Sequence, residues 1–181
     1  MKLYFARHGD TDANEHTLPD PTFGVVNESL NSLGVQQATK LAEELKDITF
    51  DAIISSPLKR ALETAEIVAR PHNQSIIVED DLQERKITSH VSLEVWEDLF
   101  DFDKNIQIEN SENLTDFFKR IYDAIEKLER KYSDKTILLV AHGGVHSALY
   151  IYANNLPLVG NLRVSNLKNC EYRIYEINTK S

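Results

Sequence analysis

The sequence predicts an α/β fold of three layers, in which a mostly parallel central sheet carries helices on both faces. Short apolar segments alternate along the chain with longer segments whose apolar residues recur at helical spacing, and this alternation is typical of such folds. The apolar segments are nearly continuous, as expected of parallel strands buried on both faces. With 181 residues and no linker or repeat, the chain is expected to form a single domain over residues 1–181.

Five segments are predicted to be strands. Four of them are short and apolar, which indicates buried strands, and they occupy residues 2–6, 52–55, 76–78 and 136–141. The fifth, at residues 172–177, alternates only in part between apolar and polar residues and is expected to expose one face.

Helical spacing predicts two helices in the first half of the chain. The helix at residues 35–46 is expected to follow a cap at Asn31 or Ser32. The helix at residues 58–70 is expected to follow the N-cap Ser56, with proline at its first position. The inward stripe of the earlier helix consists of Val35, Ala38, Leu41, Ala42 and Leu45.

Two further helices are predicted in the second half. One is long and amphipathic, at residues 111–132, and the other begins near Gly144 and runs to about residue 153. The polar stretches at residues 14–30 and 87–108 are expected to be loops or insertions above the sheet. The inward residues of the long helix are Leu114, Phe117, Phe118, Ile121, Ile125 and Leu128.

Composition narrows the classes of partner. The formal net charge of −9 argues against nucleic acid and anionic membrane as partners, although a few converging cations can still bind a small anion. The single cysteine, Cys170, excludes an intrachain disulfide. Histidines and glycines interrupt the most apolar region, residues 137–153, so no membrane span is expected. The N-terminus lacks the apolar stretch of a signal peptide, and a cytoplasmic protein is expected.

Two predicted strands end in the same way, with a histidine followed by a glycine. His8 and Gly9 follow the first strand, and His142 and Gly143 follow the fourth. Ligands of α/β sheets bind at the carboxyl ends of the strands, so both imidazoles are expected to reach one crevice. The glycines permit close backbone approach to a ligand, and a helix starting after Gly144 would aim its N–H groups at an anion. A lone histidine would as readily be a core or cap residue, but the repeated pattern argues against that interpretation.

Two arginines are predicted at the same edge of the sheet. Arg7 precedes His8 in the strand-to-loop turn, and Arg60 lies in the first turn of the helix after the second strand. The alternative for Arg60 is a surface pair with Glu63. Because a guanidinium binds phosphate oxygens bidentately, two arginines and two histidines together predict a phosphate site.

These residues belong to four sequence blocks that resemble the signatures of the histidine phosphatase superfamily, also called phosphoglycerate-mutase-like. Residues 7–11 with Asn14 resemble its Arg-His-Gly-x-Thr-x-x-Asn signature. The blocks occur in the family's order and span nearly the whole chain, which makes the resemblance specific. It implies a phosphoglycerate mutase-like fold and the hydrolysis of a small phosphate monoester. The other blocks are residues 30–38, 55–65 and 140–145.

The resemblance implies a covalent mechanism that requires neither a metal nor another cofactor. His8 would be the nucleophile and form a phosphohistidine intermediate, which divides one difficult displacement into two easier ones. Its attacking nitrogen must be unprotonated, so the other nitrogen is expected to donate to a carbonyl or similar acceptor. His142 would be the second catalytic imidazole and stabilise charge in the transition state. The other expected phosphate-binding residues are Arg7, Asn14, Arg60 and Gly143.

The resemblance places the proton donor for the leaving oxygen at Glu84. Here the sequence departs from the family pattern, because no glycine follows Glu84 and the Trp96-Glu97 pair comes later than usual. The alternative for Glu84 is a solvated acidic loop residue, in which case Asp81 or Asp10 would be the acid.

Several alternatives stay open. A cofactor-dependent phosphoglycerate mutase would return the phosphoryl group to a bound substrate, and a non-catalytic phosphate-binding protein would keep the site without turnover. A phosphopeptide phosphatase is a third possibility. His142 and His146 have the spacing of a helical zinc pair, but no further ligand accompanies them. The natural substrate and the oligomeric state do not follow from the sequence.

Overall fold

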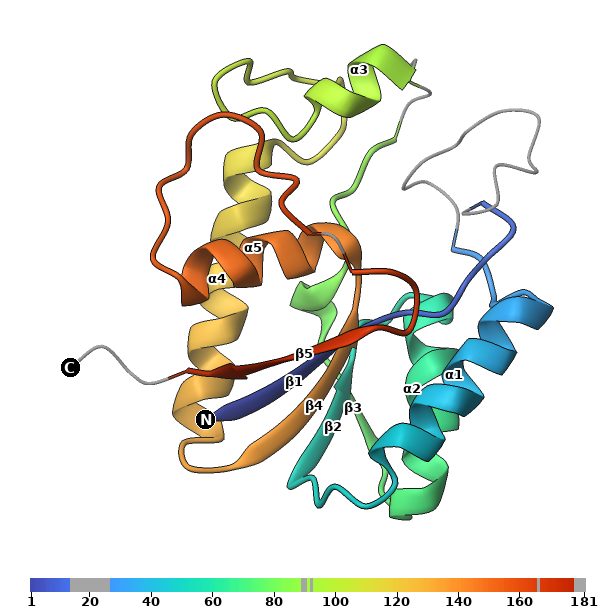
Figure 1. The fold of residues 1–181 in the computed structure, drawn as a ribbon. Coiled ribbons are helices and arrows are strands. Elements are labelled where there is room, and N and C mark those ends of the chain that lie inside the picture. The colour runs from blue at the N-terminus through green and yellow to red at the C-terminus, as the bar shows by residue number, and fades with distance from the viewer. Residues whose placement is uncertain (14–26, 89–90, 92, 166, 178–181) are drawn as a thin grey trace.

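A computed structural model of the chain describes residues 1–13, 27–88, 91, 93–165 and 167–177. Its centre is a five-stranded sheet in the order β3-β2-β4-β1-β5. The first four strands along the chain run parallel, and the last pairs antiparallel with β1 at one edge (Figure 1). The strands are β1 (Lys2–Arg7), β2 (Ala52–Ser55), β3 (Ile76–Val78), β4 (Thr136–Ala141) and β5 (Tyr172–Glu176).

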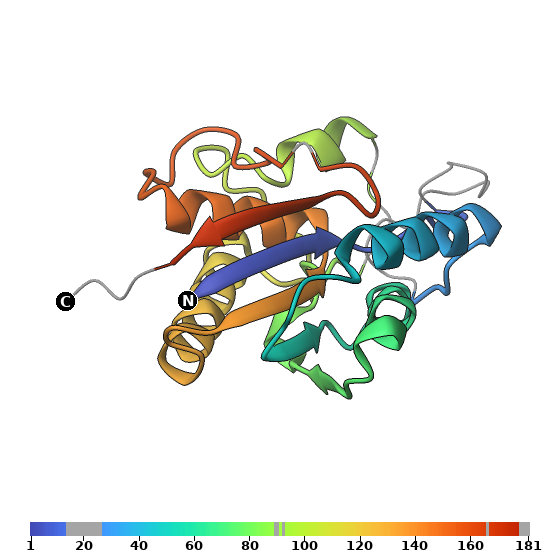
Figure 2. The same cartoon turned by 60° about the horizontal axis from the view of Figure 1, so that its bottom comes forward.

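Helices cover both faces of this sheet, which confirms the predicted three-layer α/β fold. The helices α1 and α2 lie on one face, and α4 and α5 lie on the other (Figures 1 and 2). Within the described residues, no helix is long and apolar enough to cross a membrane. The helices are α1 (Ser32–Leu45), α2 (Lys59–Ala69), α3 (Leu93–Asp98), α4 (Leu114–Lys131) and α5 (Gly143–Ala153), with short 3-10 turns at Arg70–His72 and Asp80–Leu82.

The core consists of two apolar clusters, one on each face of the sheet. Successive side chains of a strand point to opposite faces, so Tyr4 of β1 belongs to the cluster that contains Leu41 of α1, whereas Phe5 belongs to the cluster that contains Phe117 of α4. The six inward residues predicted for the long helix are all buried. Both faces are therefore anchored, which holds the carboxyl ends of the strands at one rigid edge.

The beginning of α1 differs from the prediction, because the helix starts at Ser32 and not at residue 35, and one residue of its inward stripe is different. Asn31 is the N-cap, as expected, and its side-chain oxygen accepts from the Gly34 N–H at 2.8 Å. Val35 was expected to face inward but is 45% exposed, and the buried stripe begins at Gly34 instead. A Cβ at Gly34 would lie 2.2 Å from the carbonyl oxygen of Asp10, so glycine allows α1 to approach the chain leaving β1.

The cap predicted for the second helix is wrong. The helix α2 begins at Lys59 after an extended N-cap at Leu58, and no side chain caps it. The hydroxyl of Ser56 contacts a histidine of the site instead. Arg60 nevertheless lies in the first turn of α2, as predicted.

Two other segments differ from expectation. The strand β3 was predicted to be buried, but Ile77 and Val78 are 39% and 48% exposed, because β3 is the edge strand and pairs with β2 alone. The polar stretch at residues 87–108, predicted as loop, contains the short helix α3. Of the other predicted loop, residues 14–26 lie outside the described part of the chain.

Candidate active site

The two imidazoles lie side by side at the carboxyl edge of the sheet. The strands β1 and β4 are parallel neighbours in which Arg7 is paired with Ala141, so the next residues, His8 and His142, leave the sheet together. Their ring centroids are 5.2 Å apart. The prediction that both reach one edge is confirmed, but they are less open than a crevice implies, at 4% and 1% exposed.

Two contacts fix the tautomer of His8. Its Nδ1 lies 2.7 Å from the carbonyl oxygen of Gly9, and the Nε of Arg60 donates to its Nε2 at 3.2 Å. A carbonyl oxygen can only accept and a guanidinium can only donate. Nδ1 therefore carries the proton and Nε2 presents its lone pair, as the sequence analysis expected of a nucleophile.

Electrostatics keep His8 neutral. Burial lowers the pKa of His8 well below its ordinary value, and the positive charges of Arg60 and Arg7 lower it further. Near pH 7 the imidazole is therefore uncharged, and its Nε2 carries no proton.

The two predicted arginines flank this histidine. Arg60 is 9% exposed and directed at His8, and Glu63, its expected surface partner, accepts the Leu30 N–H at 2.7 Å. Arg7 donates through Nη1 to the carbonyl of Leu167 at 2.9 Å. The buried Nε of Arg7 has no hydrogen-bond partner among the described residues. Such a donor is suited to a bound anion.

His142 is oriented by Ser56. Its Nε2 lies 2.8 Å from the Ser56 hydroxyl, which also accepts the Leu58 N–H at 3.4 Å. The hydroxyl can donate to Nε2 or accept from it, so this contact orients the ring without fixing which nitrogen carries the proton. The Nδ1 of the ring is buried and has no partner among the described residues. Burial, followed by the charge of Arg60, holds the pKa of His142 well below its usual value, so the ring is neutral.

Glu84 lies at the N-terminus of α5. One carboxyl oxygen accepts the Gly144 N–H at 2.9 Å, and the other accepts the Arg85 N–H at 3.0 Å. The helix end was expected to face an external anion, and it holds Glu84 instead. A Cβ at Gly144 would lie 2.2 Å from a Glu84 oxygen, so a side chain there would displace the carboxyl group from this position. Sequence reasoning selected Gly143 and missed this role of Gly144.

Glu84 is electrostatically coupled to both arginines. Burial lowers the pKa values of Arg7 and Arg60, and the negative charge of Glu84 acts in the opposite direction on each. Glu84 is a half-buried loop residue, and its carboxyl group accepts from two backbone N–H groups beside the site.

The remaining predicted residues have different surroundings. Asn14 lies outside the described residues. Gly143 is the first residue of α5, and a Cβ there would meet no protein atom within 4 Å. Of the alternative acids, Asp10 is 7% exposed and accepts from the Asn31 side-chain amide at 3.1 Å, whereas Asp81 is exposed.

His146 is a core residue with both ring nitrogens engaged. Its Nδ1 lies 2.7 Å from the Ser165 hydroxyl, and its Nε2 lies 2.7 Å from the Tyr175 hydroxyl. Its ring also packs against Phe5, with centroids 5.0 Å apart. In the described part of the chain, no group of three metal-ligating side chains is placed to hold an ion.

We expect the buried histidines to make stability depend on pH. Burial, with the charge of Arg173, lowers the pKa of His146 to about 4, against about 6.5 in the unfolded chain. Between these values the unfolded state binds a proton that the folded state does not bind. The free energy of unfolding should therefore fall as the pH falls from about 6.5 to about 4, with about 3 kcal/mol from His146.

Urea unfolding as a function of pH tests this expectation. His146→Gln should show a shallower loss of stability across this range, while the contributions from His8 and His142 persist. Equal slopes for the wild type and the variant would show that His146 does not carry the effect.

Comparison with known proteins identifies the family. Residues 3–181 match the Histidine phosphatase superfamily (branch 1). The chain belongs to this superfamily. It is 33% identical over 169 residues to the uncharacterized phosphatase PhoE of Bacillus subtilis, which covers 92% of this chain and 86% of that protein. It is 29% identical over 174 residues to a metal-independent phosphoserine phosphatase of Arabidopsis thaliana, covering 89% and 72%.

The fold comparison agrees with the sequence comparison. The structure of Bacillus stearothermophilus YhfR superposes with a TM-score of 0.84 at 24% identity, covering 98% of this chain and 91% of that one. The histidine phosphatase fold, together with relatives that are phosphatases, identifies the chain as a phosphatase enzyme that hydrolyses phosphate monoesters.

Proposed function

We propose that this histidine phosphatase hydrolyses a small phosphate monoester through a phosphohistidine formed at Nε2 of His8, without a metal ion, in the cytoplasm. The observation that carries the proposal is the tautomer of His8. Its unprotonated Nε2 accepts from the guanidinium of Arg60, its ring centroid lies 5.2 Å from that of His142, and its Nδ1 proton is held by a carbonyl.

The reaction has two displacements. In the first, the Nε2 lone pair attacks phosphorus, the P–O bond to the leaving alcohol breaks, and the alcohol oxygen takes a proton from the acid. In the second, water attacks phosphorus, the P–N bond breaks, and the water proton goes to the same residue, which now acts as base. Inorganic phosphate leaves, and His8 returns to its starting tautomer.

The phosphoryl group would be held by donors that point to the site. Nε of Arg7 and Nδ1 of His142 are buried nitrogens without a partner among the described residues, and Arg60 adds the positive charge of its guanidinium beside His8. Hydrogen bonds and positive charge at the phosphoryl oxygens stabilise the transition state of phosphoryl transfer. Asn14 and Gly143 would add to this set.

We assign the acid role to Glu84. It is the carboxyl group whose charge acts on both Arg7 and Arg60, and its two backbone hydrogen bonds fix its position at the start of α5. Asp10 is bonded to Asn31 at the start of α1, which makes it a weaker candidate.

The first test is the hydrolysis of para-nitrophenyl phosphate by the wild type with EDTA present. Turnover that EDTA does not reduce supports the proposal. Activity that appears only with a bisphosphoglycerate present would indicate a mutase. Phosphate binding by folded protein without any turnover would indicate a binding protein.

We also propose that the substrate carries a carboxylate near its phosphate. Arg163 is exposed, and its guanidinium lies 5.4 Å from the centre of the Trp96 ring. Its charge also acts on Arg7, whose pKa is lowered by burial first and by Arg163 in addition. A further cation whose charge is felt at Arg7 suits a second negative group on the substrate. Phosphoserine, the substrate in the name of the Arabidopsis relative, has this chemistry.

We expect Arg163→Gln to raise KM for phosphoserine about tenfold and to leave KM for para-nitrophenyl phosphate within about twofold, since only phosphoserine carries the carboxylate. Lys168→Gln, at an exposed lysine of the same segment, is the matched control and should change neither. An equal change in KM for both substrates would exclude Arg163 from carboxylate binding.

A further inference from the structure

The segment that carries Glu84 has no regular structure of its own. It follows the 3-10 turn Asp80–Leu82, and residues 83–88 belong to no helix or strand. A backbone without ladder hydrogen bonds depends for its position on the other hydrogen bonds that its N–H and C=O groups make. The bonds that hold this segment therefore decide where the Glu84 carboxyl lies.

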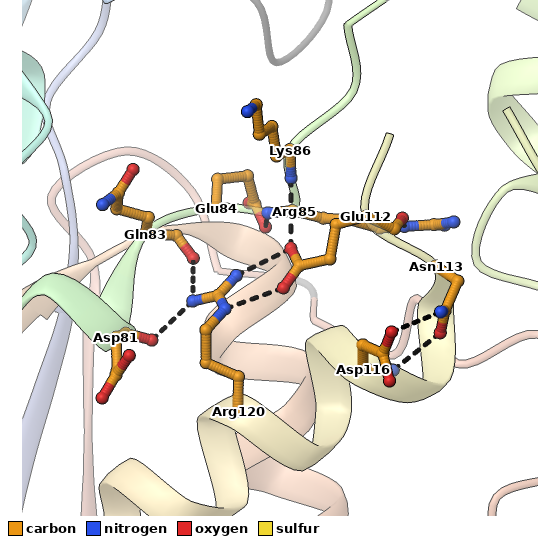
Figure 3. A network of polar contacts seen from close by, with 9 residues as sticks. All are labelled: Asp81, Gln83, Glu84, Arg85, Lys86, Glu112, Asn113, Asp116 and Arg120. Atoms are coloured by element: carbon orange, nitrogen blue, oxygen red, sulfur yellow. Dashed lines mark hydrogen bonds and ion pairs between the residues drawn. The ribbon is translucent and has the colours of Figure 1, made fainter. Parts of the chain in front are cut away.

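Arg120 of α4 bonds to the backbone before Glu84. Its Nη1 donates to the carbonyl of Asp81 at 2.6 Å and to the carbonyl of Gln83 at 3.1 Å (Figure 3). The guanidinium is itself fixed by a bidentate pair with Glu112, Nε to Oε1 at 2.7 Å and Nη2 to Oε2 at 2.8 Å. The two side chains are only 22% and 17% exposed, so solvent screens the pair less than a surface ion pair.

Glu112 bonds to the backbone after Glu84. Its Oε2 accepts the Lys86 N–H at 3.2 Å, and its own N–H donates to the Lys86 carbonyl at 2.8 Å (Figure 3). One ion pair thus bonds to the chain on both sides of Glu84.

The residue next to Glu84 strengthens this attachment. Arg85 is 2% exposed, and its Nε donates to the Glu112 carbonyl at 2.9 Å while its Nη1 donates to the carbonyl of Leu99. Its guanidinium lies 5.8 Å from the centre of the Phe100 ring. The family pattern has glycine after this glutamate, and this chain has a buried arginine tied to the same network.

We propose that Arg120 and Glu112 are positioning residues for the Glu84 carboxyl in the first displacement. The inference rests on the proposed function, in which Glu84 protonates the leaving oxygen. An acid must lie within hydrogen-bond reach of that oxygen, and a displacement of about 1 Å can reduce the rate about 10²-fold. Without Arg120, the carbonyls of Asp81 and Gln83 lose their donor and the Glu84 segment loses its fixed position.

The test is a leaving-group comparison of kcat/KM, because this quantity reports the step that releases the alcohol. A nitrophenolate leaves without much protonation, whereas an alkoxide needs the acid. Arg120→Met should reduce kcat/KM for phosphoserine about 10²-fold and for para-nitrophenyl phosphate less than about fivefold. Arg130→Met is the matched control, because Arg130 lies on the same helix in an exposed pair with Glu126, and it should change neither value.

A double variant separates positioning from a general loss of structure. Glu84→Gln alone should show the same leaving-group dependence, and Arg120→Met combined with Glu84→Gln should be no slower than Glu84→Gln, since the two act through one group. Independent, multiplying losses would overturn the proposal. Equal losses on both esters would also overturn it.

Further variants and the wild-type rates distinguish a failure of this inference from a failure of the proposed function. If Arg120→Met does not fold, as judged by circular dichroism, Arg120→Lys and Glu112→Gln take its place and should show the same leaving-group dependence. If the wild type hydrolyses neither ester, the proposed function and the inference both fail. If the wild type hydrolyses both and the variants lose both equally, only the inference fails.

Discussion

His8→Ala is expected to lower kcat for para-nitrophenyl phosphate by at least about 10³-fold, because it removes the nitrogen that forms the covalent intermediate. The nucleophile cannot be replaced by a neighbour, since the Nε2 of His142 is engaged by the Ser56 hydroxyl. The alanine side chain cannot be phosphorylated, and a phosphohistidine is hydrolysed in acid. The intermediate should therefore be sought in alkali-quenched enzyme with phosphorus-32 ester, as label present in the wild type and absent from the variant.

The fold should persist in this variant. The His8 side chain belongs to neither core cluster, and the pairing of β1 with β4 and β5 does not involve its ring. His146→Gln is the matched control, because this histidine lies one turn from His142 but bonds to Ser165 and Tyr175. It should keep near-wild-type turnover. Turnover of His8→Ala within tenfold of the wild type would remove His8 from the nucleophile role.

Arg60→Lys is expected to lower kcat/KM about 10²-fold to 10³-fold, although the positive charge is kept. The Nε of Arg60 donates to Nε2 of His8 at 3.2 Å, which places the guanidinium beside the attacking nitrogen. An ammonium group has neither the fork geometry nor the second donor position. Hydrolysis of para-nitrophenyl phosphate and inhibition by inorganic phosphate measure the effect, and both rate and phosphate affinity should fall.

Arg70→Lys is the matched substitution, because Arg70 is an exposed arginine directly after the other end of α2. It should have wild-type kinetics. Rates of Arg60→Lys within about threefold of the wild type would place Arg60 outside the reaction, whatever its contact with His8 in the free enzyme.

The predictions from sequence were strongest where the signal is local. The strands β2 and β4 have the predicted bounds, and the inward face of α4 is the predicted one, because apolar periodicity over a short window decides both. The burial of β3 was predicted wrongly, since the same apolar residues serve an edge strand and a central strand. A short stretch of sequence does not indicate which strands will be its neighbours in the sheet.

For the candidate site too, features that depend on local sequence could be predicted, and contacts between distant residues could not. That His8 and His142 reach one edge could be predicted, because parallel strands end together and each histidine directly follows a strand. The role of Ser56 was missed. Its position before Pro57 is typical of an N-cap, and its actual partner, His142, is 86 residues away.

The sequence by itself determined the fold class, the family and the pair of histidines with their two arginines, since these depend on residue type, periodicity and order along the chain. Only the tertiary structure decided which ring nitrogen of His8 is unprotonated and that Gly144 holds Glu84 across 60 residues. It alone decided that Arg120 and Glu112 hold the segment around Glu84. Hydrogen bonds between residues far apart in the chain form only when packing brings donor and acceptor within about 3 Å, and no local pattern records that distance.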